Sequence, residues 1–153
     1  NIWHHGDFAK ITNKKGFIIV GRSDTTLNPG GVRLGTAEIY SEIERFKEIK
    51  ESLVVGQSWD NDIRIILFVI LNSKSKLTED LLKRMKLMIR KNASPRHVPH
   101  KIIQVQDIPR TKSGKIVELA VKNTIEGNKI KNKEALANPL SLKQYSNIKE
   151  LQY

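Results

Sequence analysis

The segment Pro109-Arg110-Thr111-Lys112-Ser113-Gly114-Lys115 combines residue types that suit an anion-binding loop. Gly114 lets a ligand come close to the backbone, because glycine has no side chain in the way. We expect Ser113 to cap a helix that begins here and Lys115 to lie in its first turn. At that end of a helix the dipole is positive, so a lysine is stabilised there when an anion joins it. The alternative interpretation is a solvated basic loop without a ligand.

This segment is not a Walker-type phosphate loop. Pro109 occupies the position where that loop begins with glycine, and Ile116 follows Lys115 where the loop requires Ser or Thr. Any anion at the segment would therefore be bound in another way.

Two clusters nearer the N-terminus also carry residue types that suit ligand binding. They are Gly21-Arg22-Ser23-Asp24 and Gly30-Gly31-Val32-Arg33-Leu34-Gly35. Taken alone, an Arg close to an Asp can be a surface ion pair, and paired glycines can be a simple turn. Their order between Asp7 and the 109–115 segment favours a shared functional site.

The elements expected to position these residues begin with a β-hairpin. Residues 8–12 and 17–20 are predicted to be short strands joined by a turn at 14–16. Residues 25–35 contain Pro29 and three glycines, which predicts a loop. The apolar spacing of residues 36–46 then predicts a helix, with Thr36 as its N-cap.

The rest of the chain indicates a small sheet with helices on both faces. Residues 52–56, 63–71 and 101–105 are predicted strands, and the second is so continuously apolar that both of its faces must be covered. A helix starts after the cap Thr78, and another is predicted over 116–125. The basic stretch 128–133 indicates a tail or a surface strap. The expected fold is α+β, a mixed sheet of about three strands covered by about three helices.

Composition limits the kind of protein this can be. The chain has 153 residues, a net charge of +11 and no cysteine, so disulfide scaffolds and zinc-thiolate sites are excluded. The longest apolar run, residues 65–71, is about a third of the roughly 20 residues that a membrane-spanning helix needs. We expect a cytoplasmic protein without a membrane span, and the abrupt start at Asn1 suggests a piece of a longer chain.

Several motifs together resemble one known family. They occur in this order: Trp3-His4-His5-Gly6-Asp7, the run from Gly21 to Pro29, the run from Gly31 to Tyr40, the run from Pro109 to Glu118, and the run from Asn138 to Tyr145. Their order and spacing resemble the carboxyl-terminal end of the adenylate-forming acyl-CoA synthetases, and most of all the acetoacetyl-CoA synthetase branch. The resemblance covers nearly the whole chain.

The resemblance implies a reaction in two steps. A carboxylate attacks the α-phosphate of ATP to give an acyl-adenylate and pyrophosphate, and the thiol of coenzyme A then displaces AMP to give a thioester. Between the steps the small carboxyl-terminal domain swings on the large adenylation domain. Residues 1–21 would be a stub of the large domain, 22–24 the hinge, 25–127 the mobile lid domain and 128–153 a basic tail.

Residue roles follow from the resemblance by position. Asp7 would hold the ribose hydroxyls of ATP, Arg22 and Arg33 would serve the nucleotide and its phosphates, and Lys115 would point at the α-phosphate and the attacking carboxylate. Asp24 would be the hinge residue.

The same resemblance assigns a second group of residues to coenzyme A. Gly30 and Gly31 would line the path of the pantetheine chain, and Arg90 would contact the 3′-phosphate. The cofactors implied are ATP, coenzyme A and magnesium, which would enter with ATP and have its ligands outside this chain.

The sequence is compatible with more than one acid substrate and with more than one class of function. Glu118 stands where many synthetases have a basic residue, which agrees with acetoacetate as substrate, although acetate or another short-chain acid is an alternative. The acyl pocket belongs to the large domain, so the chain alone should be inactive.

An alternative function from another class is a basic module that binds nucleic acid or an acidic protein. The +11 charge is typical of such a module, but aromatic residues are few and no nucleic-acid motif is present. A lone remnant that docks on another synthetase is a third reading.

Histidine pairs are the remaining metal candidates. Neighbours such as His4 and His5 on a strand point to opposite faces, and His97 and His100 have no third ligand close in sequence. We therefore expect no metal site built by this chain.

Overall fold

The computed structural model describes residues 6–22, 25–130 and 132–152. Its centre is a three-stranded mixed sheet of β3 (Ile49–Trp59), β4 (Asp62–Leu71) and β5 (Lys101–Gln104) in that spatial order. β3 and β4 are antiparallel, whereas β4 and β5 are parallel. The predicted α+β class and the three-stranded sheet are confirmed.

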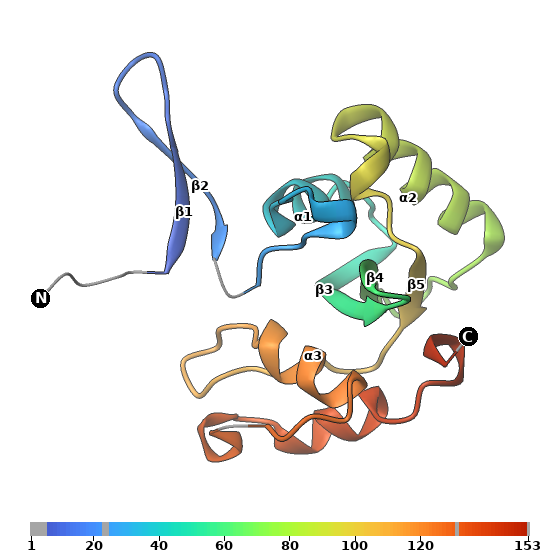
Figure 1. Ribbon diagram of the computed structural model, residues 1–153. Helices are drawn as coiled ribbons and strands as arrows, with labels where there is room; N and C mark the ends of the chain where they lie inside the picture. The colour runs from blue at the N-terminus through green and yellow to red at the C-terminus, as the bar shows by residue number, and fades with distance from the viewer. Residues whose placement is uncertain (1–5, 23–24, 131, 153) are drawn as a thin grey trace, which may run out of the picture.

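Helices cover both faces of this sheet, as Figure 1 shows. α1 (Thr36–Ile43) and α2 (Glu79–Asn92) lie on one face, and α3 (Glu118–Ile125) lies on the other with the C-terminal segment. Side chains of β4 alternate between two separate cores. Ile65, Leu67, Val69 and Leu71 belong to the core under α1 and α2, whereas Ile66 and Phe68 belong to the core under α3. Burial on both faces explains why this strand is almost continuously apolar.

The turn between β3 and β4 is as short as a hairpin allows. Asp60 and Asn61 both have positive φ, at 49° and 58°, and join Trp59 to Asp62. Two left-handed residues give the turn a twist that matches the two strands, and Asp and Asn adopt this conformation more readily than most residues. Asp62 is thereby placed at the start of β4, at one end of the sheet.

The parallel neighbour of β4 requires a crossover connection, which α2 supplies. Thr78 caps this helix as predicted, because its hydroxyl accepts the N–H of Leu81 at 3.2 Å. The buried stripe of α2 consists of Leu81, Met85 and Ile89.

The N-terminal hairpin consists of β1 (Asp7–Ile11) and β2 (Phe17–Arg22); it extends away from the sheet in Figure 1, and β2 contacts α1. Its side chains include several large exposed apolar ones: Ile11, Phe17, Ile18 and Ile19. Exposed apolar groups in such a cluster are typical of a surface that contacts another protein part.

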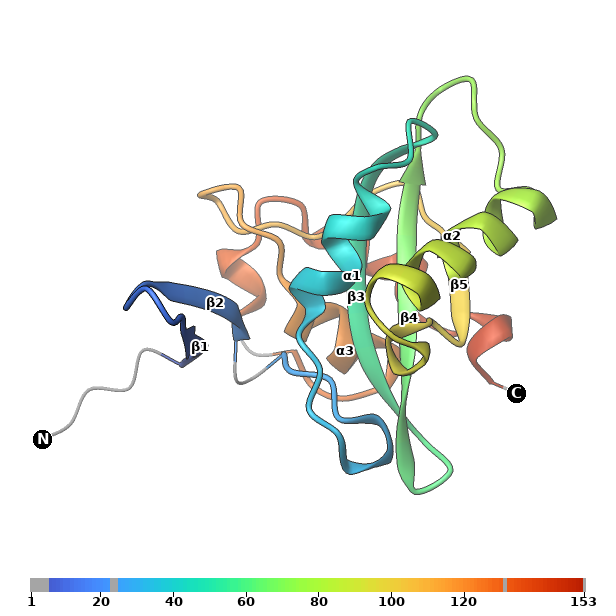
Figure 2. The same cartoon turned by 90° about the horizontal axis from the view of Figure 1, so that it is seen from above.

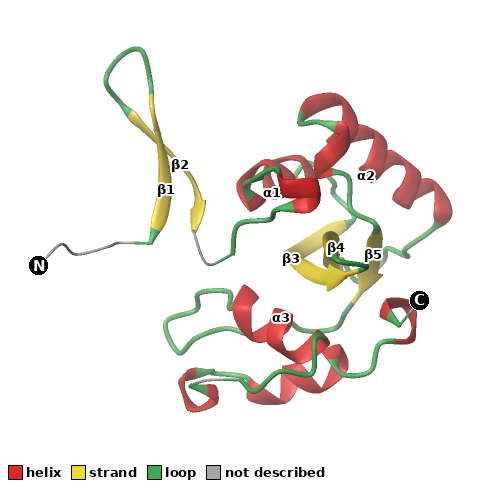
Figure 3. Ribbon diagram, in the orientation of Figure 1, coloured by secondary structure: helices red, strands yellow, loops and turns green. Residues whose placement is uncertain are grey.

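The last residues are not a tail. Residues 132–152, which we call the C-terminal strap, form 3₁₀ helices over Lys133–Ala135, Pro139–Tyr145 and Lys149–Leu151, joined by the loops drawn in green in Figure 3. Four of its apolar side chains are buried in the core under α3: Leu136, Leu142, Tyr145 and Leu151. The expected basic tail is therefore corrected to a folded strap, because this core is incomplete without it.

Two helix boundaries also differ from the prediction. α1 has Gly35 at its N-cap, with Thr36 as the first helical residue, and it ends at Ile43 before Phe46. α3 begins at Glu118, two residues later than predicted, because Ile116 is held in an extended bridge to Arg110.

Candidate functional site

The 109–115 segment forms a closed loop in front of α3. Arg110 and Ile116 pair as an isolated β-bridge, Thr111 donates its N–H to the Lys115 carbonyl at 2.8 Å, and Gly114 donates to Thr111 at 2.9 Å. We call residues 110–116 the lysine loop. Lys115 is exposed, and its backbone is held in place because its N–H donates to Thr111 Oγ1 at 3.1 Å.

Two expectations about this loop are wrong. Ser113 does not cap α3, because its hydroxyl bonds Thr111 Oγ1 at 3.0 Å and Val117 occupies the N-cap without a side-chain bond. Lys115 does not lie in the first helical turn, because the bridge at Ile116 keeps the chain extended until Glu118. The lysine therefore lies on an arm of the loop, opposite Thr111, and not in a helix.

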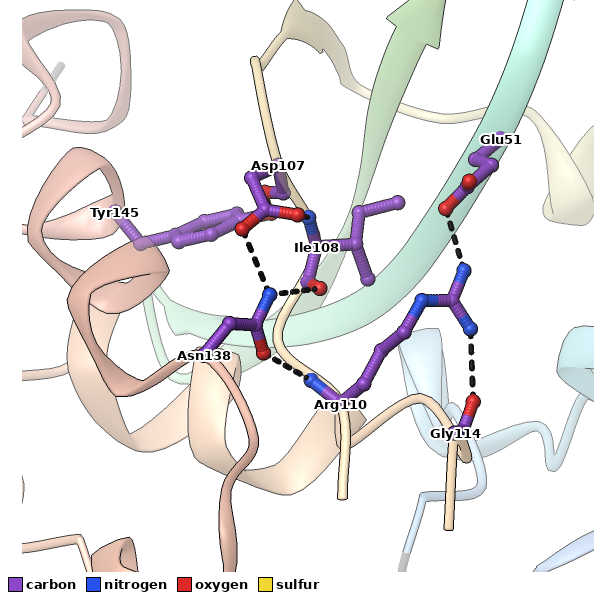
Figure 4. Close-up of polar contacts among 7 residues, drawn as sticks. All are labelled: Glu51, Asp107, Ile108, Arg110, Gly114, Asn138 and Tyr145. Atoms are coloured by element: carbon purple, nitrogen blue, oxygen red, sulfur yellow. Dashed lines mark hydrogen bonds and ion pairs between the residues drawn. The ribbon is translucent and has the colours of Figure 1, made fainter. Parts of the chain in front are cut away.

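A single arginine holds the lysine loop to the sheet. The guanidinium of Arg110 donates to the carbonyl of Gly114 at 2.9 Å and forms a close ion pair with Glu51 of β3, as Figure 4 shows. Arginine suits this place because its planar group can donate in two directions at once. The position of Gly114, next to Lys115, is therefore fixed relative to the first part of β3.

A cleft lies beside this loop along the open edge of β3. Its volume is about 630 Å³, and its lining includes Tyr40, Arg110, Ile116 and Glu118. The Tyr40 hydroxyl donates to Glu118 and accepts the N–H of Val54 at 3.0 Å. Burial, with the Glu118 charge adding, raises the pKa of Tyr40 well above its usual value, so the hydroxyl keeps its proton. Glu118 is thus joined to Tyr40, a residue 78 positions away in the chain.

The Gly30-Gly31 pair forms a tight turn at the other end of the sheet. Pro29–Gly31, which we call the glycine turn, is closed by the Val32 N–H donating to the Pro29 carbonyl at 3.2 Å, and both glycines have left-handed φ, 58° at Gly30 and 75° at Gly31. Both oxygens of Asp62 accept the N–H of Gly30, at 2.8 and 2.9 Å. This bond is the main cause of the lowered pKa of Asp62. Gly31 has no atom within 4 Å of the place where a Cβ would stand, so its backbone is open to a ligand.

One arginine lies beside the glycine turn, and two further exposed arginines are candidates for binding an anion. A guanidinium nitrogen of Arg96 lies 3.5 Å from where a Cβ on Gly30 would stand. Arg33 follows the turn and is exposed, and Arg90 is exposed in the last turn of α2. Arg84 of the same helix differs, because its guanidinium is paired with Glu48 at 2.7 Å and Asp80 at 2.9 Å.

The lysine loop and the glycine turn lie at opposite ends of β3. Arg110 ties the loop to Glu51 near the start of the strand, and Asp62 ties the turn to the strand end, where it pairs with Trp59. From Glu51 to Trp59 the strand extends about 26 Å at roughly 3.3 Å per residue. In Figure 2 the two loops, orange and blue, accordingly lie toward opposite ends of the strands. One small ligand cannot contact both at once.

The hairpin brings two of the nucleotide candidates together. Asp7 and Arg22 are Cα partners across β1 and β2. Asp24, the expected hinge residue, lies outside the described residues.

Of the two histidines that the structure describes, His97 is built into the fold and His100 is exposed. His97 is buried, with its Nδ1 at 2.8 Å from Ser94 Oγ and its Nε2 at 2.7 Å from Glu38 Oε2, so both nitrogens have partners. His4 and His5 lie outside the described residues. Within residues 6–22, 25–130 and 132–152, no group of three or more His, Asp or Glu side chains could hold a metal ion. None of the helices in this described part has the length and apolar composition needed to cross a bilayer.

Sequence reasoning missed the side chains that hold the site residues in place. Asp62, Glu51 and Tyr40 were not singled out, because each acts on a partner at least 30 residues away in the chain. One local signal was available for Asp62, since it closes a turn of Asp60 and Asn61 and such turns fix where the next strand begins.

A small α+β domain with a lysine loop at one end and a glycine turn at the other defines a class of protein: the C-terminal domain of an adenylate-forming enzyme. The family model of the AMP-binding enzyme C-terminal domain matches residues 38–115. The chain belongs to this family.

Individual relatives show which branch of this family the chain is similar to. The chain is 58% identical over 151 residues to the acetoacetyl-coenzyme A synthetase of Rhizobium meliloti (strain 1021), and 50% identical over 153 residues to the acetoacetyl-CoA synthetase of Xenopus tropicalis. The acetoacetyl-CoA synthetase structure from Streptomyces lividans matches with a TM-score of 0.86 and 39% identity over 99% of the chain. These matches cover 99% of this chain but only 23% of the length of each of the three relatives.

Proposed function

We propose that this chain is the mobile lid of an ATP-dependent acid:CoA ligase that converts acetoacetate to acetoacetyl-CoA, with release of AMP and pyrophosphate. The observation that carries the proposal is the separation of the lysine loop from the glycine turn by about 26 Å of strand, at roughly 3.3 Å per residue. A lid with two functional ends can present one end to the large domain for each half-reaction. Residues 22–24 would be the hinge that permits the swing.

In the first half-reaction the lysine loop would face the substrates. A carboxylate oxygen attacks the α-phosphorus of ATP, and pyrophosphate leaves with the electron pair of the broken bond. Negative charge gathers between two anions, and the ammonium of Lys115 would stabilise it in a site from which water is excluded. The support in this chain is that Lys115 is exposed on a loop whose backbone is fixed by Arg110 and Thr111.

Asp7 and Arg22 would bind the nucleotide from the hairpin. Asp7 would accept hydrogen bonds from the ribose hydroxyls, and Arg22 would contact the nucleotide beside it. Their register as partners across β1 and β2 supports one shared ligand. Arg33 would contribute positive charge toward a phosphate.

In the second half-reaction the glycine turn would face the substrates. The thiol sulfur of coenzyme A attacks the acyl carbonyl, its proton is released, and AMP leaves. Gly31 would line the pantetheine chain, because its backbone is open, while Gly30 would anchor the turn, because its N–H is already bonded to Asp62. Arg90 would bind the 3′-phosphate through charge-assisted hydrogen bonds from its guanidinium.

The partner of this lid would be a large adenylation domain in the same polypeptide, in a cytoplasmic enzyme. The exposed apolar cluster on β1 and β2 supports a contact with that domain. Magnesium would enter bound to ATP and neutralise phosphate charge, with ligands outside the part of the chain described here.

The full-length protein that contains this chain tests the proposal. Pyrophosphate release and thioester formation should depend on ATP, coenzyme A and an acid, and kcat/KM should be higher for acetoacetate than for acetate or other short acids. A preference for acetate would correct the substrate. No release of pyrophosphate with any short acid would overturn the ligase function.

A further inference from the structure

The C-terminal strap runs beside the lysine loop and is bonded to it. Thr111 pairs with Leu136 as a β-bridge, Lys112 donates its N–H to the carbonyl of Ala135 at 3.2 Å, and Ala137 donates to the carbonyl of Arg110 at 2.8 Å. The strap is thus a short strand-like neighbour along one arm of the loop.

One strap side chain, Asn138, bonds three groups at the base of the loop, as Figure 4 shows. Its Oδ1 accepts the N–H of Arg110 at 2.8 Å, while its Nδ2 donates to Asp107 Oδ2 at 2.7 Å and to the carbonyl of Ile108 at 3.0 Å. An amide can both donate and accept, so this residue can hold backbone on both sides of Pro109. The backbone of Arg110, whose guanidinium supports Gly114, is therefore fixed by the strap.

The strap is rigid enough to act as a support because its own anchors are buried. Tyr145 is fully buried, donates its hydroxyl to the carbonyl of Asp107 at 2.8 Å and packs edge-on against Phe68 with ring centroids 4.9 Å apart. Gln144 donates to the same carbonyl at 2.7 Å but has no bond to the lysine loop. The strap lies outside residues 38–115, the part that the family model matches.

We propose that Asn138 is a positioning residue for Lys115, acting through Arg110 and Gly114, and that the strap is the support that keeps the lysine loop in its adenylating shape. This inference rests on the proposed role of Lys115. A distant mutation that misplaces a reacting group by about 1 Å can lower the rate about 100-fold. Loss of one support of the lysine loop should therefore slow the first half-reaction without weakening substrate binding.

The test uses the full-length enzyme with Asn138→Ala and, as a matched control in the same strap, Gln144→Ala. Asn138→Ala should lower kcat for acid-dependent pyrophosphate release about 10- to 100-fold, with KM for ATP and for the acid changed less than about twofold. Thioester formation from supplied acyl-adenylate should stay at the wild-type rate in both variants, which also shows that both fold.

A second readout does not depend on activity. Trypsin cleaves after Lys and Arg, and the lysine loop offers Arg110, Lys112 and Lys115. Cleavage there should be faster in Asn138→Ala than in wild type or Gln144→Ala, because cleavage follows local opening of the backbone.

The outcomes separate this inference from the proposed function. Equal cleavage rates in all three proteins, or a loss of both half-reactions together in Asn138→Ala, would overturn the positioning role. Absence of pyrophosphate release in the wild-type enzyme would overturn the proposed function instead.

Discussion

The carboxylate of Asp62, at the start of β4, accepts the backbone N–H of Gly30 with both oxygens, at 2.8 and 2.9 Å. The two residues are 32 positions apart in the chain, so the bond fixes the glycine turn to the end of the sheet. A turn that is held in place before the ligand arrives loses less conformational freedom when coenzyme A binds.

Asp62→Ala should therefore raise KM for coenzyme A, by about tenfold if the binding free energy falls by about 1.4 kcal/mol. The pyrophosphate-release step should be unaffected, because the turn lies at the far end of the sheet from Lys115. Titration of coenzyme A in the thioester half-reaction measures this change, and an unchanged KM would show that the bond does not matter for binding.

The Asp62 bond should also persist through the neutral pH range. Its pKa is lowered in the folded protein, chiefly by the N–H of Gly30, so the carboxylate stabilises the fold above the unfolded pKa. That contribution is lost only as the pH falls through the lowered folded value. KM for coenzyme A in wild type should show no break attributable to this group between about pH 5 and 8, well above a carboxyl pKa of about 3.9.

Arg90→Gln should weaken the binding of coenzyme A but not that of 3′-dephospho-coenzyme A, because only coenzyme A carries the phosphate assigned to this side chain. A lost charge-assisted hydrogen bond is worth about 1.5–3 kcal/mol, so KM for coenzyme A should rise roughly 10- to 150-fold. Arg45→Gln is the control, since it removes the same charge from an exposed arginine in the turn just after α1, where it pairs with Glu42 at 3.4 Å. Equal losses for both coenzymes would show that Arg90 does not bind this phosphate.

Tyr40→Phe should destabilise the domain without altering the chemistry of either half-reaction. The change leaves the Val54 N–H and the Glu118 carboxylate without the hydroxyl they share. A buried backbone N–H left without its partner, here that of Val54, costs about 1–3 kcal/mol, which thermal or urea unfolding of the variant would reveal. Unfolding identical to wild type would mean that water replaces the hydroxyl in the cleft.

Much of the fold could be predicted because its signals are local. The continuous apolar run of β4 and the stripe of Leu81, Met85 and Ile89 after the Thr78 cap were each sufficient to identify their elements. The start of α3 was misplaced because Ile116 fits the apolar spacing of the helix, while the bridge that removes it from the helix is formed with Arg110.

A surface strap was one of the two readings of the basic stretch 128–133, but its folded course and buried side chains could not be predicted because their signal is irregular. Its buried residues lie on short 3₁₀ turns, which lack the spacing of an α-helix or a strand, and the stretch before them is polar and basic. The supports of the site were missed for a related reason, since bonds such as that of Asn138 to Arg110 join residues that only the folded chain brings together.

The most direct test of the account measures both half-reactions in Lys115→Ala and in Gly31→Val of the full-length enzyme. Lys115→Ala should lower acid-dependent pyrophosphate release by about 100- to 1,000-fold and spare thioester formation from supplied acyl-adenylate. Gly31→Val should do the reverse, because φ is 75° at this position and the added side chain would stand in the pantetheine path. If each variant damages both half-reactions equally, the two ends of the lid do not serve separate steps and the account is contradicted.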